Sequence, residues 1–329
     1  MKFGPVPVTE AEGGVLAHAV SLPGTRFRKG RVLSAEDAAR LGAAGMQEVI
    51  VARLDPGDVG EDVAADRLAR ALVPAPATAG LRIGAASTGR VNLHASGVGV
   101  VGIDAARIDA VNAVHPMITV ATLPRWHRVA TRNMVATVKI ISYAVPEEAL
   151  ARACAAAGDA LRLHPVQHRS ATLIETLVGE DPGDKGRRSI RMRLDRMGVT
   201  LGQRRLVAHR TDALAEAVAA SGDEVILILT GSATSDLHDV APEALRRAGG
   251  EVVHFGMPVD PGNLLFFGRL GDRPVIGLPG CARSPALNGA DWVLERILCG
   301  VGVTPADIMS MGVGGLLKEP PSRPRPREA

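Results

Sequence analysis

The stretch Glu224-Val-Ile-Leu-Ile-Leu-Thr-Gly-Ser-Ala-Thr-Ser-Asp-Leu-His-Asp239 decides the fold class of this chain. Residues 224–229 form a largely apolar run typical of a buried strand. The Gly, Ser and Thr residues after it predict a tight turn that leads into a helix over 236–248. Such a junction gathers backbone N–H groups at the start of the helix, where the helix dipole favours negative charge. The stretch therefore predicts a site for an anionic ligand.

Strands and helices alternate along the chain before this stretch. The pattern predicts strands over 160–163, 171–178 and 204–209, and helices over 147–157, 184–197 and 212–220. Strands separated by helices imply right-handed crossovers and a parallel sheet. We therefore expect an α/β fold over 135–300, with three layers and a mainly parallel sheet that has helices on both faces. Ligands of such sheets bind at the carboxyl ends of the strands, where the quoted turn lies.

Two Pro-Gly turns follow and flank a predicted hairpin. Pro261-Gly262-Asn263 comes before the hairpin, Gly271-Asp272 forms its turn, and Pro279-Gly280 comes after it. We expect a long helix over 282–298 after the second Pro-Gly turn.

The remaining segments are less regular. We expect a smaller mixed α+β N-terminal region over 1–75, in which Ser34 caps a helix, and a mixed β-rich region over 76–134. A tail over 301–329 is expected to be partly disordered, because residues 318–329 are rich in Pro and Arg. This tail could equally be a linker to a domain that is absent from the chain.

The composition argues against several classes of protein. A net charge of +3 in 329 residues and 2% aromatic residues do not provide the basic, aromatic surface that nucleic-acid binding uses. No apolar run reaches the ~18 residues of a membrane span, and no secretory signal is evident, so we expect a cytoplasmic protein. Three cysteines without CxxC spacing support neither a disulfide framework nor a cysteine zinc site. We interpret the basic cluster at 185–193 as a solvated helix face, with a local anion site as the alternative.

Three turns, at 230–239, 261–263 and 278–284, resemble in order and spacing the motifs of the molybdenum-cofactor biosynthesis domain. Molybdopterin molybdotransferases and molybdopterin adenylyltransferases share this domain. The family motifs are Ser/Thr-Gly-Gly-x-Ser-x-Gly-x-x-Asp, then a Pro-Gly-Lys-Pro-like turn, then Gly-Leu-Pro-Gly-Asn-Pro. The corresponding residues here are Thr230-Gly-Ser-Ala-Thr-Ser-Asp-Leu-His-Asp239, Asp260-Pro-Gly-Asn-Leu264 and Gly277-Leu-Pro-Gly-Cys-Ala282. Below, the turns at 230–239, 261–263 and 278–284 are called the first, second and third turns.

The resemblance implies a site for molybdopterin or adenylylated molybdopterin, with molybdate as a further substrate and Mg²⁺ as the expected metal. In the family, the acid that corresponds to Asp239 lies at the pterin and Mg²⁺/molybdate site, so Asp239 is the expected catalytic and metal-binding residue. The alternative for Asp239 is a solvated position in the first turns of its helix. The expected pterin-binding residues are Thr230, Gly231, Ser232, Thr234, Ser235, Asp236, Pro261, Gly262, Asn263, Pro279, Gly280 and Ser284. Ser284 could instead be a hydrogen-bonding residue at the start of the last helix.

The sequence departs from the family motifs at several positions. Ser232 and Asp236 replace two glycines of the first motif, and His209 begins a segment in which the family often has two acids. Binding of the pterin is therefore better supported than catalysis, and two functions stay open. The leading one, which the resemblance implies, is molybdotransferase activity, the insertion of molybdate into adenylylated molybdopterin. The other is non-catalytic carriage or sensing of the pterin, together with a nucleotidyltransferase or a molybdoenzyme.

Two further implications of the resemblance follow. Adenylyltransferase activity is a lower alternative, because it would need an ATP site that the sequence does not identify. Members of the family commonly dimerise, so a homodimer is a candidate assembly.

Overall fold

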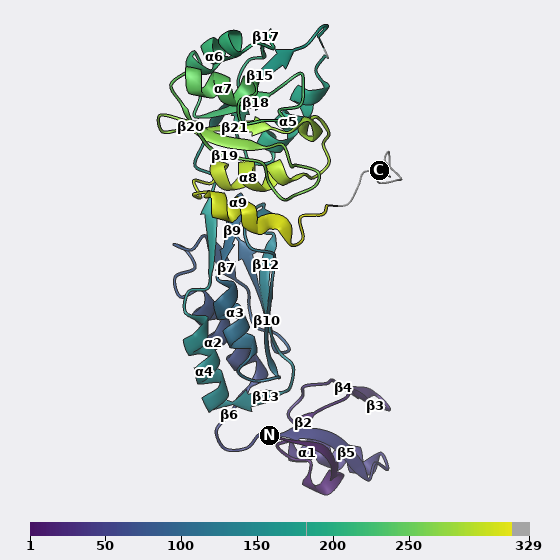
Figure 1. The fold of residues 1–329 in the computed structure, drawn as a ribbon. Helices are drawn as coiled ribbons and strands as arrows, with labels where there is room; N and C mark the ends of the chain where they lie inside the picture. The colour runs from purple at the N-terminus through teal and green to yellow at the C-terminus, as the bar shows by residue number, and fades with distance from the viewer. Residues whose placement is uncertain (182, 318–329) are drawn as a thin grey trace, which may run out of the picture. The chain divides into compact units, whose positions relative to one another are not determined.

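The computed structural model describes residues 1–181 and 183–317, and this part of the chain divides into two compact units (Figure 1). The first unit comprises residues 1–97 and 101–163, and the second comprises residues 98–100 together with the described residues from 164 onward.

The first unit contains the N-terminal half of the chain's helices and strands. These are β1 (Lys2–Pro7), η1 (Val8–Glu10), β2 (Val15–Leu16), β3 (Val20–Leu22), β4 (Thr25–Phe27), α1 (Ala35–Ala43), β5 (Glu48–Arg53), β6 (Asp58–Gly60), α2 (Glu61–Leu72), β7 (Leu81–Ile83), β8 (Arg90–Ala95), α3 (Ala105–Asn112), β10 (Ile118–Thr122), β11 (Arg128–Val129), β12 (Met134–Ile140), β13 (Ala144–Pro146) and α4 (Glu147–Ala157). Strands β9 (Gly99–Ile103) and β14 (Leu161–Pro165) contain residues of both units.

The second unit contains the elements predicted around the three turns. These are β15 (Ser170–Leu177), α5 (Lys185–Asp195), β16 (Thr200–Leu201), β17 (Arg205–Ala208), α6 (Thr211–Ala219), β18 (Val225–Leu229), α7 (Val240–Arg247), β19 (Glu251–Phe255), β20 (Phe266–Leu270), β21 (Arg273–Leu278), η2 (Gly280–Arg283), α8 (Gly289–Leu298), α9 (Pro305–Met309) and η3 (Ser310–Gly312).

The N-terminal residues of the first unit have a hydrophobic core of their own. Buried residues between Val8 and Val51 form one cluster around the sheet β1-β5-β2 and helix α1. Ser34 caps α1, as predicted, and forms a capping box with Asp37. Asp37 is buried, and its two carboxylate oxygens accept hydrogen bonds from Arg31 at 2.8 Å each.

The Asp37 pair predicts that α1 loses stability in acid. The hydrogen bonds from Arg31, followed by the backbone hydrogen bond from Ser34, lower the pKa of Asp37 in the folded state. The resulting stabilisation is complete above the ordinary carboxyl pKa of about 3.9 and is lost as the pH falls through the lowered value. The stability of α1 can be measured at a series of pH values from the hydrogen exchange of its amides by NMR. We expect wild type to be more stable than Asp37→Asn at pH 7, and we expect this difference to vanish in acid. A difference that persists at the lowest pH would contradict this origin.

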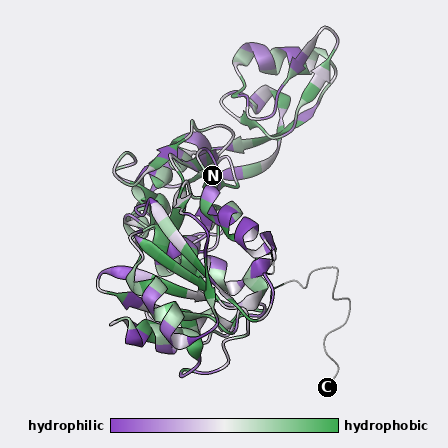
Figure 2. Ribbon diagram, turned by 90° about the horizontal axis from the view of Figure 1, so that it is seen from above, coloured by the Kyte–Doolittle hydropathy of each residue, from purple (hydrophilic) through white to green (hydrophobic). Residues whose placement is uncertain are grey.

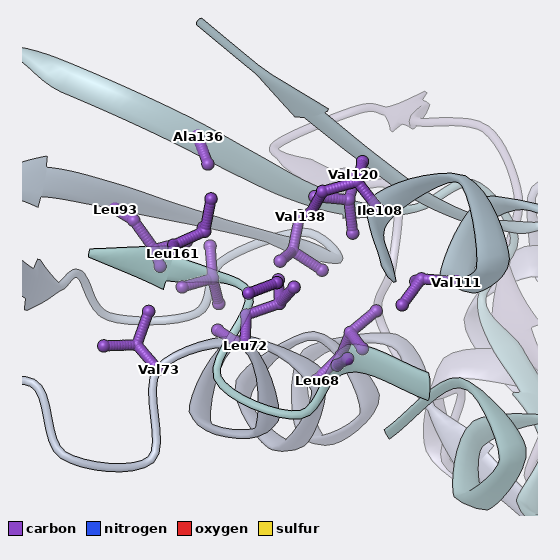
Figure 3. Packing of buried hydrophobic residues seen from close by; sticks show 14 of the residues in the cluster. Leu68, Leu72, Val73, Leu93, Ile108, Val111, Val120, Ala136, Val138 and Leu161 are labelled. Atoms are coloured by element: carbon purple, nitrogen blue, oxygen red, sulfur yellow. The ribbon is translucent and has the colours of Figure 1, made fainter. Parts of the chain in front are cut away.

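A larger core in the first unit joins α2, α3 and α4 to the strands from β7 to β14. Leu68 and Leu72 of α2, Ile108 of α3 and Val138 of β12 all lie in this cluster (Figure 3). Strand β12 pairs with β8 and β10, and α4 packs against α2 and α3. Residues 135–163, which were predicted to belong to the α/β region, therefore pack in the first unit.

The second unit has the mainly parallel sheet that the sequence predicts. Its strand order is β16-β15-β18-β21-β20-β19, and β17 pairs with β15. The pairs of β15 with β16, β17 and β18 are parallel, as is the pair of β18 with β21, whereas β20 is antiparallel to both β21 and β19. The predicted hairpin is confirmed as β20 and β21, which are joined at Gly271.

Helices cover both faces of this sheet. Ile226 and Ile228 of β18 pack in one cluster with α6 and α7, whereas the side chain of Leu229 lies against Gly186 of α5. Alternate residues of a strand point to opposite faces, so α5 lies on the face opposite α6 and α7. Hydrophobic residues run along the strands, and the helices carry both hydrophobic and hydrophilic residues (Figure 2). The three-layer α/β fold is thus confirmed, with smaller N-terminal sheets in addition.

Two helices begin later than the sequence predicts. Helix α7 begins at Val240 instead of residue 236, because Asp239 is its N-cap. Helix α8 begins at Gly289 instead of residue 282. Ser284 precedes Pro285 and has an extended backbone, which ends η2, and Asn288 then caps α8 with a capping box.

The predicted tail over 301–329 is only partly within the described residues. Its first part contains α9 and η3. The prediction of disorder for residues 318–329 lies outside the described residues. None of the helices within the described ranges is long and apolar enough to span a membrane.

Candidate functional site

The three turns lie at the same edge of the sheet in the second unit. Leu229 of β18 pairs with Leu278 of β21, so the first and third turns follow neighbouring parallel strands. Phe255 at the end of β19 pairs with Phe266 at the start of β20, and Phe266 pairs with Gly277 of β21. The connection from β19 to β20, which contains the second turn, therefore starts and ends at this carboxyl edge. Parallel α/β sheets bind their ligands at such an edge.

The first turn starts with a close backbone contact. The Gly231 N–H donates to Thr176 Oγ1 at 2.9 Å, and the same hydroxyl lies 2.8 Å from Nδ1 of His209. A Cβ atom on Gly231 would lie 2.6 Å from the Thr176 carbonyl oxygen and 3.0 Å from the Val178 nitrogen. The turn therefore needs glycine here in order to pack on the end of β15. His209, one of the departures from the family motif, supports the turn through Thr176.

The side chains of the first turn divide into buried and exposed groups. Thr230 and Thr234 are buried, with their hydroxyl oxygens 3.3 Å apart. Ser232, Ser235 and Asp236 are exposed. The side chains of Ser232, Ser235 and Asp236 are thus accessible to a ligand, whereas the two threonines are buried.

Asp239 organises the end of the first turn. Its Oδ1 accepts a hydrogen bond from the Val240 N–H at 2.7 Å, and its Oδ2 accepts one from the Ser235 N–H at 2.9 Å. Asp239 is therefore a helix cap that also fixes the loop before α7. The structure brings Asp239 close to Ser235, as the motif predicts, but both of its carboxylate oxygens already have backbone partners.

The donor set around Asp239 does not form a metal site by itself. Among residues 1–181 and 183–317, no group of three His, Cys, Asp or Glu side chains is arranged to hold a metal ion. Asp236, the other acid of the turn, accepts a hydrogen bond from the His238 N–H at 2.8 Å. Mg²⁺ usually keeps several waters and binds through one or two carboxylates together with phosphate oxygens of a substrate. Asp236 and Asp239 shape the loop, and a Mg²⁺ ion here would need the remaining oxygens from the ligand and from water.

The second turn packs against the start of α8. The Gly289 N–H donates to the Pro261 carbonyl oxygen at 2.9 Å, and a Cβ atom on Gly262 would lie 2.8 Å from the Gly289 nitrogen. Gly262 is buried in this contact, whereas Asn263 is exposed. Asn263 is therefore the residue of this turn that faces solvent.

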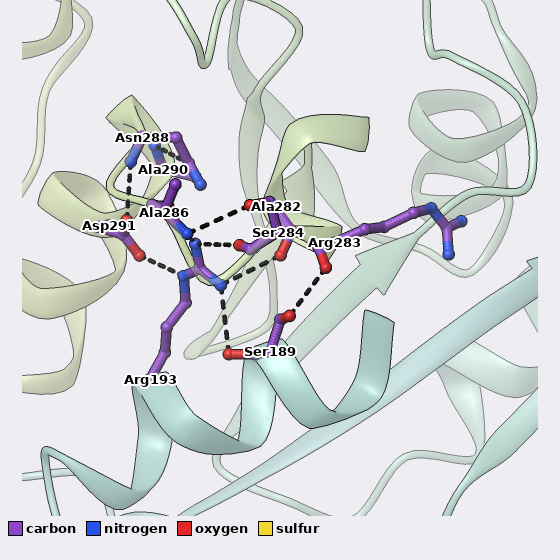
Figure 4. Close-up of polar contacts among 9 residues, drawn as sticks. All are labelled: Ser189, Arg193, Ala282, Arg283, Ser284, Ala286, Asn288, Ala290 and Asp291. Carbon is purple, nitrogen blue, oxygen red and sulfur yellow. Dashed lines mark hydrogen bonds and ion pairs between the residues drawn. The ribbon is translucent and has the colours of Figure 1, made fainter. Parts of the chain in front are cut away.

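A buried arginine holds the third turn (Figure 4). Arg193 of α5 is 8% exposed, and its Nε donates to Oδ1 of Asp291. Its other hydrogen bonds go to the carbonyl oxygens of Ser189 (3.2 Å), Ala282 (3.1 Å), Ser284 (2.9 Å) and Ala286 (2.9 Å). Arg187 of the same helix is 4% exposed. The prediction of a solvated face for the cluster 185–193 is therefore wrong for these two arginines, because they extend from α5 into the protein.

The predicted ligand residues of the third turn differ in exposure. Pro279 is buried, and Gly280 is exposed with no atom within 4 Å of the position of a Cβ. Ser284 Oγ accepts a hydrogen bond from the Ala286 N–H at 3.3 Å, so this hydroxyl stabilises the loop and does not cap α8. Cys281 is half-buried, and burial raises the pKa of its thiol. Gly280 is thus the most open position of the turn.

The loop that follows β15 was not predicted as part of the site. This loop also leaves the carboxyl edge, and Asp181 in it receives two hydrogen bonds from Arg204, at 2.9 and 2.7 Å. Arg204 also donates to the buried Glu175 of β15 at 3.2 Å. The hydrogen bonds from Arg204, with a further one from the Gly183 N–H, lower the pKa of Asp181. A second strand followed by Gly, acids and a helix was the signal in the sequence that could have identified this loop.

Comparison with known proteins agrees with this geometry. Residues 175–298 match the model of a probable molybdopterin binding domain, and this span contains all three turns. The second unit contains a domain of the molybdenum cofactor biosynthesis family. The resemblance inferred from the motifs is therefore confirmed. Residues 5–53 match the model of a domain of unknown function.

Two solved structures are similar to the chain at low levels. One is the molybdopterin biosynthesis moea protein from Pyrococcus horikosii, at 13% identity and a TM-score of 0.33, with coverage of 91% of this chain and 75% of that one. The other is molybdenum cofactor biosynthesis protein B, at 14% identity and a TM-score of 0.31, with coverage of 41% of this chain and 96% of that one. A search of curated proteins finds no match. The family assignment rests on the domain model.

Proposed function

We propose that the second unit of this protein binds molybdopterin at the carboxyl edge of its sheet. The supporting observation is that the three turns meet at one edge, within the span that matches the molybdopterin-binding model. Ser232, Ser235 and Asp236 of the first turn, Asn263 of the second and Gly280 of the third are exposed and would contact the ligand. Hydroxyl and backbone N–H groups are suitable donors to a phosphorylated pterin.

Within this proposal, carriage of the pterin is better supported than its conversion. Asp239 is the acid on which the transfer reaction would depend, and both of its oxygens accept backbone hydrogen bonds. A carrier needs a binding edge but no dedicated metal ligands. Such a protein would deliver the pterin to a nucleotidyltransferase or a molybdoenzyme.

Molybdotransferase activity is the second candidate. The motifs of the three turns are ones that the resemblance shares with molybdotransferases, and Asp239 lies beside Ser235 in the first turn, as the motif implies. In this alternative, adenylylated molybdopterin and molybdate are substrates and AMP is released.

A titration separates these functions. The purified protein is titrated with molybdopterin, then with adenylylated molybdopterin, molybdate and Mg²⁺, while AMP is quantified. We expect saturable binding of the pterin. Binding without AMP release supports carriage, stoichiometric or catalytic AMP release that requires molybdate supports the transferase, and failure to bind either pterin contradicts the proposal.

Substitutions of Asp239 distinguish a helix cap from a metal ligand. Asn is as good an N-cap as Asp, whereas Ala costs about 1 kcal/mol in stability. Asn keeps an oxygen for the Val240 N–H but places a donor NH2 where Oδ2 accepts from the Ser235 N–H. We therefore expect Asp239→Asn to lower the unfolding free energy less than Asp239→Ala does, and pterin affinity to follow the unfolding free energy in both variants. If Asp239→Asn instead removes a Mg²⁺-dependent gain in pterin affinity, the acid binds the metal and the cap is not its main role.

A further inference from the structure

Arg283 is an arginine of the third turn that no part of the family motif requires. Its backbone is fixed on both sides: Ser189 Oγ donates to the Arg283 carbonyl oxygen at 2.8 Å, and Arg193 donates to the carbonyl oxygens of Ala282 and Ser284. Its side chain extends away from this network (Figure 4). The backbone of Arg283 is thus held in place, and its guanidinium lies outside this hydrogen-bond network.

The guanidinium of Arg283 lies between the elements that form the carboxyl edge. Nη2 donates to the carbonyl oxygen of Thr230, where β18 ends, at 2.7 Å. Nη1 lies 3.1 Å from the position that a Cβ would take on Gly186, in the first turn of α5. Arg283 therefore connects the third turn to the first turn and reaches the start of α5.

Arg283 also has hydrogen-bonding capacity to spare. A guanidinium carries five N–H donors, and the hydrogen bond to Thr230 uses one of them. Arg193 and Arg204 have carboxylate partners, but within the described ranges no carboxylate lies within ion-pair distance of Arg283. The nearby start of α5 has no side-chain cap. The remaining donors of Arg283 are therefore available to an anion.

We infer that Arg283 binds the terminal phosphate of the pterin, an inference that rests on the proposed function. Its planar fork matches two oxygens of a phosphate and forms charge-assisted hydrogen bonds with them. The hydrogen bond to Thr230 and the anchored backbone fix the side chain before the ligand arrives, which reduces the entropy lost on binding.

Arg283→Ala, Arg283→Lys and the control Arg196→Ala test this role. Arg196 is exposed at the C-terminal end of α5, so its substitution removes the same charge away from the carboxyl edge. We expect Arg283→Ala to weaken molybdopterin binding about 10- to 100-fold, Arg283→Lys to weaken it less, and Arg196→Ala to leave it unchanged. Pterin whose phosphate a phosphatase has removed should bind wild type and Arg283→Ala equally. Inorganic phosphate should compete with molybdopterin on wild type and not on Arg283→Ala.

The outcomes separate the inference from the proposed function. Unchanged binding in Arg283→Ala, or an equal loss for the pterin with and without phosphate, overturns the role of Arg283 and leaves pterin binding intact. If wild type binds inorganic phosphate through Arg283 but binds no pterin, the anion site stands and the proposed function fails. If wild type binds neither, both fail. Circular dichroism of each variant establishes that it is folded.

Discussion

Replacing Arg193 with alanine should destabilise the second unit by about 3 to 5 kcal/mol, the range for breaking a buried ion pair from one side. The substitution would leave the carboxylate of Asp291, which is 6% exposed, without its counter-charge. It would also remove the donors that satisfy the carbonyl oxygens of Ala282 and Ser284. The third turn and the start of α8 would lose the side chain that joins them to α5.

Denaturant unfolding that is followed by the fluorescence of Trp292 measures this effect. Trp292 lies in α8, and a Trp126→Phe background removes the other tryptophan of the chain. Arg196→Ala on the same helix is the matched control and should change the unfolding free energy by less than about 0.5 kcal/mol. The double variant Arg193→Met/Asp291→Asn should lose less unfolding free energy than Arg193→Ala, because no uncompensated buried charge then remains. A loss in Arg193→Ala no larger than in the control would contradict the role of the ion pair.

Much of the α/β unit was predictable because its central strand, β18, is fully buried. The apolar run of β18 and the alternation of strands with helices indicate a parallel sheet without further information. Once the sheet is parallel, its strand ends share an edge, and the meeting of the first and third turns follows. The second turn joins them because β20 is antiparallel to both of its neighbours.

The details of the site were less predictable, because single hydrogen bonds and distant partners decide them. The start of α7 depends on whether Asp236 or Asp239 caps the helix, and both are good capping residues. The burial of Arg193 depends on Asp291, which lies 98 residues away in the sequence. No local pattern distinguishes such an arginine from one on a solvated helix face.

Gly231 and Gly280 of the candidate site are expected to respond differently to substitution by alanine. Gly231→Ala should destabilise the second unit by about 1 to 3 kcal/mol and weaken pterin binding strongly, because its Cβ would meet the backbone of β15. Gly280→Ala should leave the unfolding free energy close to that of wild type, because no protein atom lies within 4 Å of its Cβ position.

The pair of variants separates packing from ligand contact. If the pterin approaches the backbone at Gly280, Gly280→Ala lowers its affinity while the unfolding free energy stays the same, whereas Gly231→Ala lowers both. Unfolding followed by Trp292 fluorescence and titration with molybdopterin measure the two quantities on the same samples. Equal stability of Gly231→Ala and wild type would show that the first turn can move away from Thr176. The glycine would then be available for the close ligand contact that the family motif implies.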